Sequence, residues 1–192
     1  MGTHQIKNAI LCIEVAKHLE ISQLAIQNGI SRVHQPLRME IVSKNPLIIL
    51  DGAHNPDKMR TTVETVQKCI STQVNKYQGN KKLTHLHTYK LINLHLVVGF
   101  SADKNISRMI KQLTTLKPKT IAVTRNTTNP FRKVADPQSV SNQFQKLLPN
   151  SKIKIFLNPS DALAWSKSKT KTGDILLVTG SIFVSGELRQ QF

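Results

Sequence analysis

The feature that most restricts the fold of this sequence is a repeated alternation of short, largely apolar runs with longer amphipathic segments. Because a strand covered on both faces is apolar at nearly every position, the runs predict the central strands of a sheet. These runs lie at residues 47–50, 92–98, 120–124, 153–156 and 175–178. Helical segments separate them, which predicts right-handed crossover connections and a mostly parallel sheet.

This pattern divides the chain into two parts. Residues 36–192 are expected to form one α/β, Rossmann-like domain with helices on both faces of the sheet. Residues 1–35 have a different pattern, in which apolar side chains at spacings of three and four predict a helix over 3–19. Ser22 can cap a second helix, and Asn28-Gly29 is expected to loosen or end it.

The charge balance favours anionic partners. The 192 residues include 27 Lys and Arg against 11 Asp and Glu, a formal net charge of +16. Between Thr65 and Ala135 there are 13 basic residues and one acid, Asp103. Such a field attracts nucleic acid, nucleotides, and phosphorylated or polycarboxylate substrates, although a solvated lysine-rich surface would have the same composition. Six Phe, two Tyr and one Trp are too few for an RNA-stacking surface.

Composition also suggests a compartment. There is no apolar run of about 18 residues and no apolar secretory stretch at the start, so we expect no membrane span. Two cysteines, Cys12 and Cys69, do not make a disulfide framework. A cytoplasmic location is the simplest interpretation.

Three glycine-containing segments directly follow predicted strands: Asp51–Pro56, Gly99–Lys104 and Thr179–Ser181. Ligands of open parallel sheets bind at the carboxyl ends of the strands, so these segments are expected to meet at one edge. Asp51 could accept hydrogen bonds from a ribose, and His54 could contact a carboxylate or phosphate. The alternative is that Asp51 and Asn55 are only turn and cap residues and that His54 is merely exposed.

Several catalytic motifs are absent from the sequence. None of the eight glycines precedes a lysine, which excludes a P-loop within these residues. Neither G-x-G-x-x-G nor G-x-S-x-G occurs. His85, His87 and His95 lie close together in the sequence without a cysteine pair or an acidic partner, which favours a polar loop over a zinc site.

Five motifs, in order along the chain, resemble the carboxyl-terminal portion of folylpolyglutamate synthases and dihydrofolate synthases, members of the Mur ligase superfamily. The family patterns are G-x-H-Q-x-x-N-A, R-x-E, D-G-A-H-N-P, G-x-x-x-D-K and T-G-S. They correspond to Gly2–Ala9, Arg38–Glu40, Asp51–Pro56, Gly99–Lys104 and Thr179–Ser181. Leu37 stands where the family has a glycine before the arginine.

The resemblance implies an ATP-dependent ligase, in which ATP phosphorylates a folate carboxylate and the amine of L-glutamate attacks the acyl phosphate. By motif, Asn8, Arg38 and Asp51 would bind ATP, with Asp51 at the ribose. His54 and Ser181 would line the glutamate pocket. No residue of this chain is assigned as catalytic or as a metal ligand, because the Mg²⁺ ligands and the P-loop belong to the family's ATPase domain.

The resemblance also implies that residues 1–35 are the last helices of that central ATPase domain, and that residues 36–192 are the Mur ligase-type carboxyl-terminal domain. The chain would then be a split gene product, a fragment or a decayed sequence, inactive alone and possibly partnered by a separately encoded P-loop domain. Folate and L-glutamate would be the substrates of the intact enzyme. The alternative is a non-catalytic basic module that binds nucleotide or nucleic acid, although nucleic acid is not the expected partner.

Overall fold

The computed structural model describes residues 3–78, 92–131 and 133–192. The chain forms two compact units, Met1–Pro36 and Leu37–Phe192. Residues 79–91, which include His85 and His87 of the predicted polar loop, lie outside the described residues. Within the described part of the chain, no helix is both long and apolar enough to cross a membrane.

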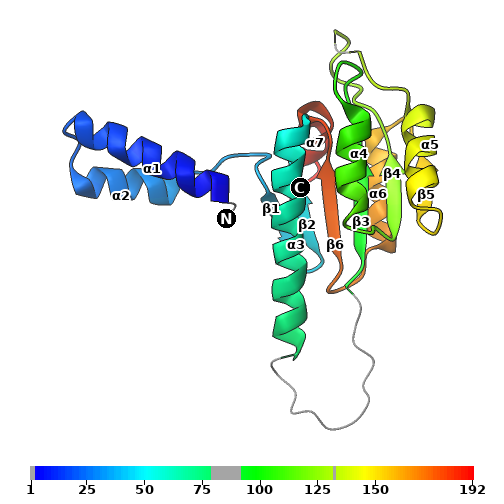
Figure 1. Cartoon of the computed structure of the whole chain (residues 1–192), viewed down its shortest axis with the longest axis horizontal. Helices are drawn as coiled ribbons and strands as arrows, with labels where there is room; N and C mark the ends of the chain where they lie inside the picture. Colours follow the sequence, from blue (N-terminus) through cyan, green and yellow to red (C-terminus); the bar gives the residue numbers. More distant parts are fainter. Residues whose placement is uncertain (1–2, 79–91, 132) are drawn as a thin grey trace. The chain divides into compact units, whose positions relative to one another are not determined.

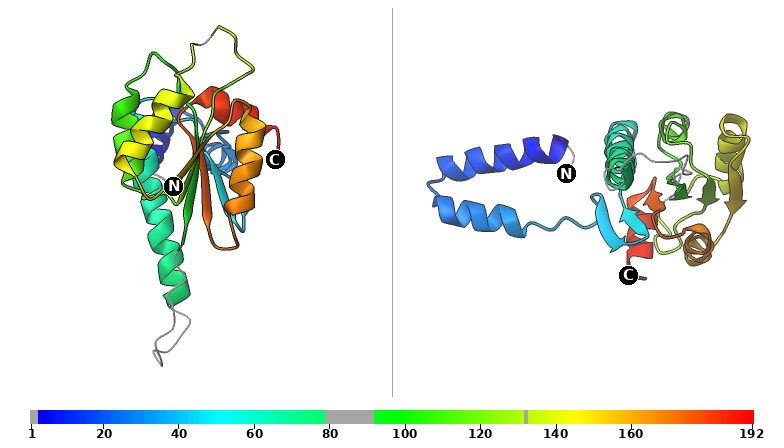
Figure 2. Two further views of the ribbon diagram at one scale, coloured as in Figure 1. Left: turned by 90° about the vertical axis from the view of Figure 1, so that its right-hand side faces the viewer. Right: turned by 90° about the horizontal axis from the view of Figure 1, so that it is seen from below.

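The first unit is a hairpin of two helices, α1 (Thr3–His18) and α2 (Gln23–Arg32) (Figure 2). Ser22 caps α2 as expected, because its Oγ accepts a hydrogen bond from the Ala25 N–H at 3.3 Å. The expectation that α2 ends at Asn28-Gly29 is wrong, since the helix continues to Arg32. One glycine inside a helix costs only about 1 kcal/mol relative to alanine, which the remaining helical turn offsets.

This unit has almost no core of its own. No residue of α2 is buried. Most large apolar side chains of the two helices and the turn between them are more than one-third exposed, whereas Ile13 and Ile26 are partly buried. The exposed ones are Ile6, Ile10, Leu11, Val15, Leu19, Ile21, Leu24 and Ile30. The apolar face of α1 is therefore only partly covered.

The second unit is built on a six-stranded sheet in the order β1-β2-β6-β3-β4-β5 (Figure 1). The strands are β1 (Glu40–Lys44), β2 (Leu47–Leu50), β3 (Leu94–Val98), β4 (Thr120–Val123), β5 (Lys152–Ile155) and β6 (Ile175–Thr179). All neighbouring pairs are parallel except β1 with β2. The expected mostly parallel α/β sheet is confirmed.

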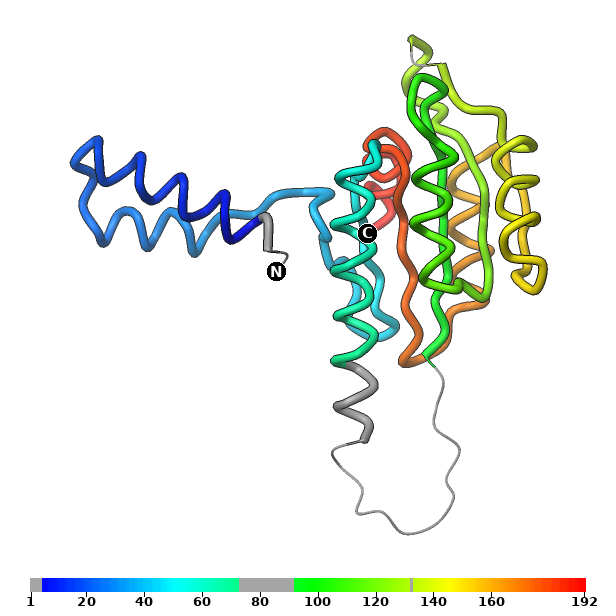
Figure 3. Tube along the Cα trace, in the orientation of Figure 1, coloured from blue at the N-terminus to red at the C-terminus, as the bar shows by residue number. Residues whose placement is uncertain are grey.

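Five helices cover the two faces of this sheet, and the chain winds from strand to helix and back (Figure 3). One face carries α3 (Pro56–Gln78), α4 (Ile106–Thr114) and α5 (Pro137–Leu147), and the other carries α6 (Pro159–Lys169) and α7 (Ile182–Arg189) (Figure 2). Only α7 had no counterpart among the helices expected from sequence.

Each face has its own apolar core, which explains why the central strands are apolar at every position. Ile49 and Leu96 point into the cluster beneath α3, α4 and α5. Leu50 and Val178 belong to the cluster beneath α6 and α7. Alternate residues of one strand thus enter opposite cores, and the polar segments at the strand ends lie at the rim.

Candidate functional site

The turn after β2 and the turn after β6 lie side by side. The two strands are parallel neighbours in which Leu50 pairs with Val178. Ser185 Oγ, on the second turn of α7, donates a hydrogen bond to the backbone oxygen of Asp51 at 2.8 Å. A Cβ atom added at Gly52 would lie 3.2 Å from Ile182 Cγ1. Asp51–Pro56 and Thr179–Ser181 therefore meet at the carboxyl edge of the sheet, as expected.

The third glycine segment packs against the same edge. Gly180 has a φ of +97°, and a Cβ atom there would lie 2.6 Å from the Gly99 carbonyl oxygen. A Cβ atom at Gly99 would lie 2.8 Å from the Thr124 oxygen. These contacts exclude larger residues, so the glycines allow close backbone approach between neighbouring loops.

Asp51 holds this edge together. The side chain is 5% exposed. Oδ1 accepts hydrogen bonds from the Ala53 N–H at 3.0 Å and from Thr62 Oγ1 at 2.6 Å. Oδ2 accepts from the Met39 N–H at 3.0 Å. Three of the roughly four acceptor positions of the carboxylate are thus used by the chain itself.

The segment that carries Arg38 is strained. Leu37 and Met39, on either side of it, have φ values of +59° and +51°. Non-glycine residues rarely adopt this left-handed region, and each costs on the order of 1–3 kcal/mol. In the motif that Arg38–Glu40 resembles, the residue before the arginine is glycine. Glycine adopts a positive φ without strain, so the φ of Leu37 explains why a glycine suits this position. The Leu37 oxygen accepts a 2.7 Å hydrogen bond from the Gly52 N–H, which fastens the segment to the turn after β2.

Glu40 fixes the same segment from its other side. Its carboxylate accepts a hydrogen bond from the Leu37 N–H at 3.0 Å. It also pairs with Arg189 Nε at 2.9 and 3.0 Å, which ties β1 to the end of α7. The backbone around Arg38 is therefore held from both sides while the Arg38 side chain is exposed.

His54 forms a pair with Lys58 that was not among the contacts predicted from the sequence. The His54 Nδ1 lies 2.8 Å from the Gly52 oxygen, and its Nε2 lies 3.3 Å from Lys58 Nζ. A carbonyl oxygen only accepts and an ammonium only donates, so the ring is the tautomer with the proton on Nδ1. The spacing of four residues at the start of a helix was the available signal for this contact.

Lys58 is in an unfavourable place for a cation. Partial burial lowers its pKa, and the charge of Arg38 lowers it further, while Asp51 acts in the opposite direction. Lys58 also lies in the first turn of α3, where the partial positive charge of the helix end disfavours a lysine. The charge of Arg38 and the helix end both favour an anion next to the Lys58 ammonium.

Ser181 lies at the same edge but is only 2% exposed. It is the N-cap of α7, and its Oγ accepts a hydrogen bond from the Phe183 N–H at 3.2 Å. The hydroxyl proton remains available as a donor. Asn8 lies on α1 in the other unit, where its side chain is exposed.

His95 does not belong to this edge. It is buried near the amino ends of the strands, where Nδ1 lies 2.8 Å from Thr120 Oγ1 and Nε2 lies 3.5 Å from Asp174 Oδ2. Burial lowers the pKa of His95 despite the nearby carboxylate. Among the described residues no cluster of three or more His, Cys, Asp or Glu could hold a metal ion.

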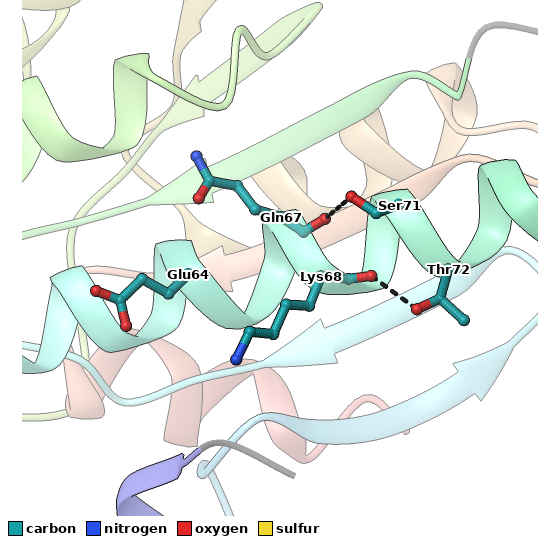
Figure 4. Close-up of a pocket in the computed structure, with 5 residues that line it drawn as sticks. All are labelled: Glu64, Gln67, Lys68, Ser71 and Thr72. Carbon is teal, nitrogen blue, oxygen red and sulfur yellow. Dashed lines mark hydrogen bonds between the residues drawn. The ribbon is translucent and has the colours of Figure 1, made fainter.

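A shallow hollow on α3 does not form a binding site. It is lined by Glu64, Gln67, Lys68, Ser71 and Thr72, all from that one helix (Figure 4). Two of these hydroxyls already donate to the helix backbone, Ser71 to the Gln67 oxygen and Thr72 to the Lys68 oxygen. The described carboxyl edge remains the place where functional groups from separate elements converge.

Comparison with known proteins finds relatives in sequence and in fold. No protein-family model matches the sequence. The chain is 28% identical over 191 residues to a probable bifunctional folylpolyglutamate synthase/dihydropteroate synthase of Haloferax volcanii, covering 98% of this chain and 20% of that protein. It is 26% identical over 201 residues to the dihydrofolate synthase/folylpolyglutamate synthase of Bacillus subtilis, covering 100% of this chain and 40% of that protein.

This chain is homologous to a segment of the folylpolyglutamate synthases. This chain spans 20% of the length of the first of these two relatives and 40% of the length of the second. Its fold matches a Mycobacterium tuberculosis folylpolyglutamate synthase complexed with ADP and AMPPCP, with a TM-score of 0.76 and 20% identity over 99% of this chain and 40% of that one. It also matches E. coli FolC in complex with DHPP and ADP, with a TM-score of 0.67 and 22% identity over 94% of this chain and 37% of that one.

Proposed function

We propose that this chain is the carboxyl-terminal, glutamate-ligase part of an ATP-dependent folylpolyglutamate synthase-like enzyme, which adds L-glutamate to folate through an acyl phosphate. One observation carries the proposal. The turn Asp51–Pro56 and the cap Thr179–Ser181 meet at the carboxyl edge of the sheet, in a chain homologous along its whole length to such enzymes.

The nucleotide side of the proposal rests on charge and position. The exposed Arg38 guanidinium can donate paired hydrogen bonds to phosphate oxygens, and its backbone is held in place by Asp51 and Glu40. Asp51 keeps about one acceptor position for a ribose hydroxyl while it organises the edge. Asn8, on α1, is assigned to ATP by motif alone.

The glutamate side rests on His54 and Ser181, which line the proposed pocket. Ser181 caps α7 with its oxygen and can donate its hydroxyl proton to a carboxylate. His54 is fixed through Nδ1 by the Gly52 oxygen. A helix that begins beside each of these residues also favours a negatively charged group there.

The remaining machinery belongs to a P-loop segment that is not among these 192 residues. ATP bound there with Mg²⁺ would supply the phosphoryl group, and the metal ligands are expected in that segment. We therefore expect the purified 192-residue chain to show no turnover with ATP, tetrahydrofolate and L-glutamate. Measurable product in that assay would contradict this part of the proposal.

Ligand titration tests the assignment directly. We expect the 192-residue chain to bind ADP and L-glutamate saturably in calorimetric or NMR titrations. His54→Ala is expected to weaken glutamate binding about tenfold, because it removes a side chain that lines the proposed pocket and contacts Lys58. His18→Ala, an exposed histidine at the end of α1, is the matched control. Equal glutamate affinity in the two variants would contradict the proposed pocket.

A second candidate is a non-catalytic module that binds nucleotide or nucleic acid through its basic surface. The 13 basic residues against one acid between Thr65 and Ala135 favour it. RNA affinity that falls steeply and linearly on a log–log plot against salt would support this module. Weak RNA binding beside saturable ADP and glutamate binding would support the ligase assignment.

A further inference from the structure

Lys58 is fixed at the same edge as the predicted ligand-binding residues. Its backbone N–H donates to Asn55 Oδ1 at 2.9 Å, which caps the first turn of α3. One turn later Thr62 donates to Asp51. The Lys58 side chain reaches back to His54, with Nζ at 3.3 Å from Nε2. The turn after β2 thus sets both the position of the Lys58 backbone and the direction of its side chain.

Lys58 lies near a second cation, Arg38, but has no ion-pair partner in the described part of the chain. Within the described residues neither Lys58 nor Arg38 has a carboxylate oxygen within the 4.0 Å of an ion pair. Asp51 is close enough to act on Lys58 electrostatically, but its oxygens accept three hydrogen bonds from other groups. Lys58, in the first turn of α3, and Arg38 are interacting cations of which neither forms an ion pair, and this arrangement favours a bound oxyanion.

The tautomer of His54 decides which group can meet that oxyanion. Because Nδ1–H donates to the Gly52 oxygen and Nε2 accepts from Lys58, the ring has no N–H left for a ligand. The Lys58 ammonium has three protons, of which the contact with His54 uses one. Lys58 is therefore the donor at this position, and His54 orients it.

We propose that Lys58 binds a carboxylate or phosphate oxygen of the ligand at this edge, with His54 as the residue that positions its ammonium. The proposal rests on the proposed function only for the identity of the ligand. An amino-acid carboxylate and a nucleotide phosphate share the chemistry that Lys58 would recognise, so both are tested.

The experiment uses the 192-residue chain with ¹³C-labelled lysine and observes the Lys58 side-chain signal by NMR. L-glutamate, ADP and inorganic phosphate are titrated separately. We expect at least one of them to shift the Lys58 signal and to raise its pKa. We expect K58M to weaken that ligand about tenfold, as the loss of a charge-assisted hydrogen bond would. K68M, on the exposed face of the same helix, is the matched control and should bind as the unchanged chain does.

A second pair of variants tests the positioning role of His54. His54→Gln keeps a side-chain oxygen that can accept from Lys58, so it should recover most of the affinity that His54→Ala loses. A Lys58 signal unaffected by all three ligands, or K58M binding as K68M does, would overturn the proposal. Phosphate binding that depends on Lys58, without binding of glutamate or ADP, would support the oxyanion site and contradict the ligase assignment.

Discussion

Replacing Asp51 with asparagine should destabilise the second unit strongly. The oxygen of asparagine can replace Oδ1 and still accept from Ala53 and Thr62. The amide nitrogen then replaces Oδ2 and faces the Met39 N–H, which is also a donor. One charge-assisted hydrogen bond is lost, worth about 1.5–3 kcal/mol, and a buried donor remains unsatisfied at about 1–3 kcal/mol. We expect a loss of roughly 3 kcal/mol, against a typical total stability of about 5–15 kcal/mol.

Urea unfolding provides the measurement. Trp165, the single tryptophan, lies on α6 with its ring centre 5.5 Å from that of Phe156, so its fluorescence reports on this unit. Asp57→Asn is the matched control, because Asp57 is exposed in the first turn of α3 and should contribute about 0.3–1 kcal/mol. If Asp51→Asn costs no more than Asp57→Asn, the carboxylate does not hold the edge together.

Three further predictions concern the fold. Gly180→Ala should destabilise the second unit by several kcal/mol or prevent its folding, because the φ of Gly180 is +97° and a Cβ atom there would lie 2.6 Å from the Gly99 oxygen. Gly29→Ala is the contrasting variant. Its Cβ atom would lie in open space on α2, so it should increase the helicity measured by circular dichroism. Stability should fall as the pH drops below about 6.5, by up to about 1.4 kcal/mol per pH unit, because burial lowers the pKa of His95 and the unfolded chain takes up the proton first. His95→Gln should flatten that dependence in urea unfolding at pH 5.5 and 7.5, and parallel profiles would contradict the reasoning. Residues 37–192 alone should keep the thermal transition of this unit, since both apolar cores consist of residues from that range; a collapse of the transition would show otherwise.

Much of the local structure was readable from the sequence. The apolar run Leu47–Leu50 is a strand, and Asn55 caps the helix that begins at Pro56. Asp136 caps α5 and Asn158 caps α6, each followed by proline at the first helical position. These features depend on neighbouring residues: a cap needs an N–H two or three positions away, and a strand covered on both faces needs consecutive apolar side chains.

Asn28-Gly29 shows the limit of such local rules. The pair was expected to weaken or end α2, yet the helix passes through it to Arg32. A glycine changes helix stability by only about 1 kcal/mol, so the neighbouring turns decide the outcome. The helix α7 was missed for a related reason, because no long periodic pattern follows the short segment after β6.

The sequence by itself determined all the elements except α7, their order and the polar segments at the strand ends. Only the tertiary structure decided that β6 lies between β2 and β3, which brings Asp51 into contact with Ser185, 134 positions away. Parallel pairing of strands distant in sequence depends on how whole elements pack, and no local pattern encodes it. The left-handed backbone around Arg38 and the contact between His54 and Lys58 arise only within that packing.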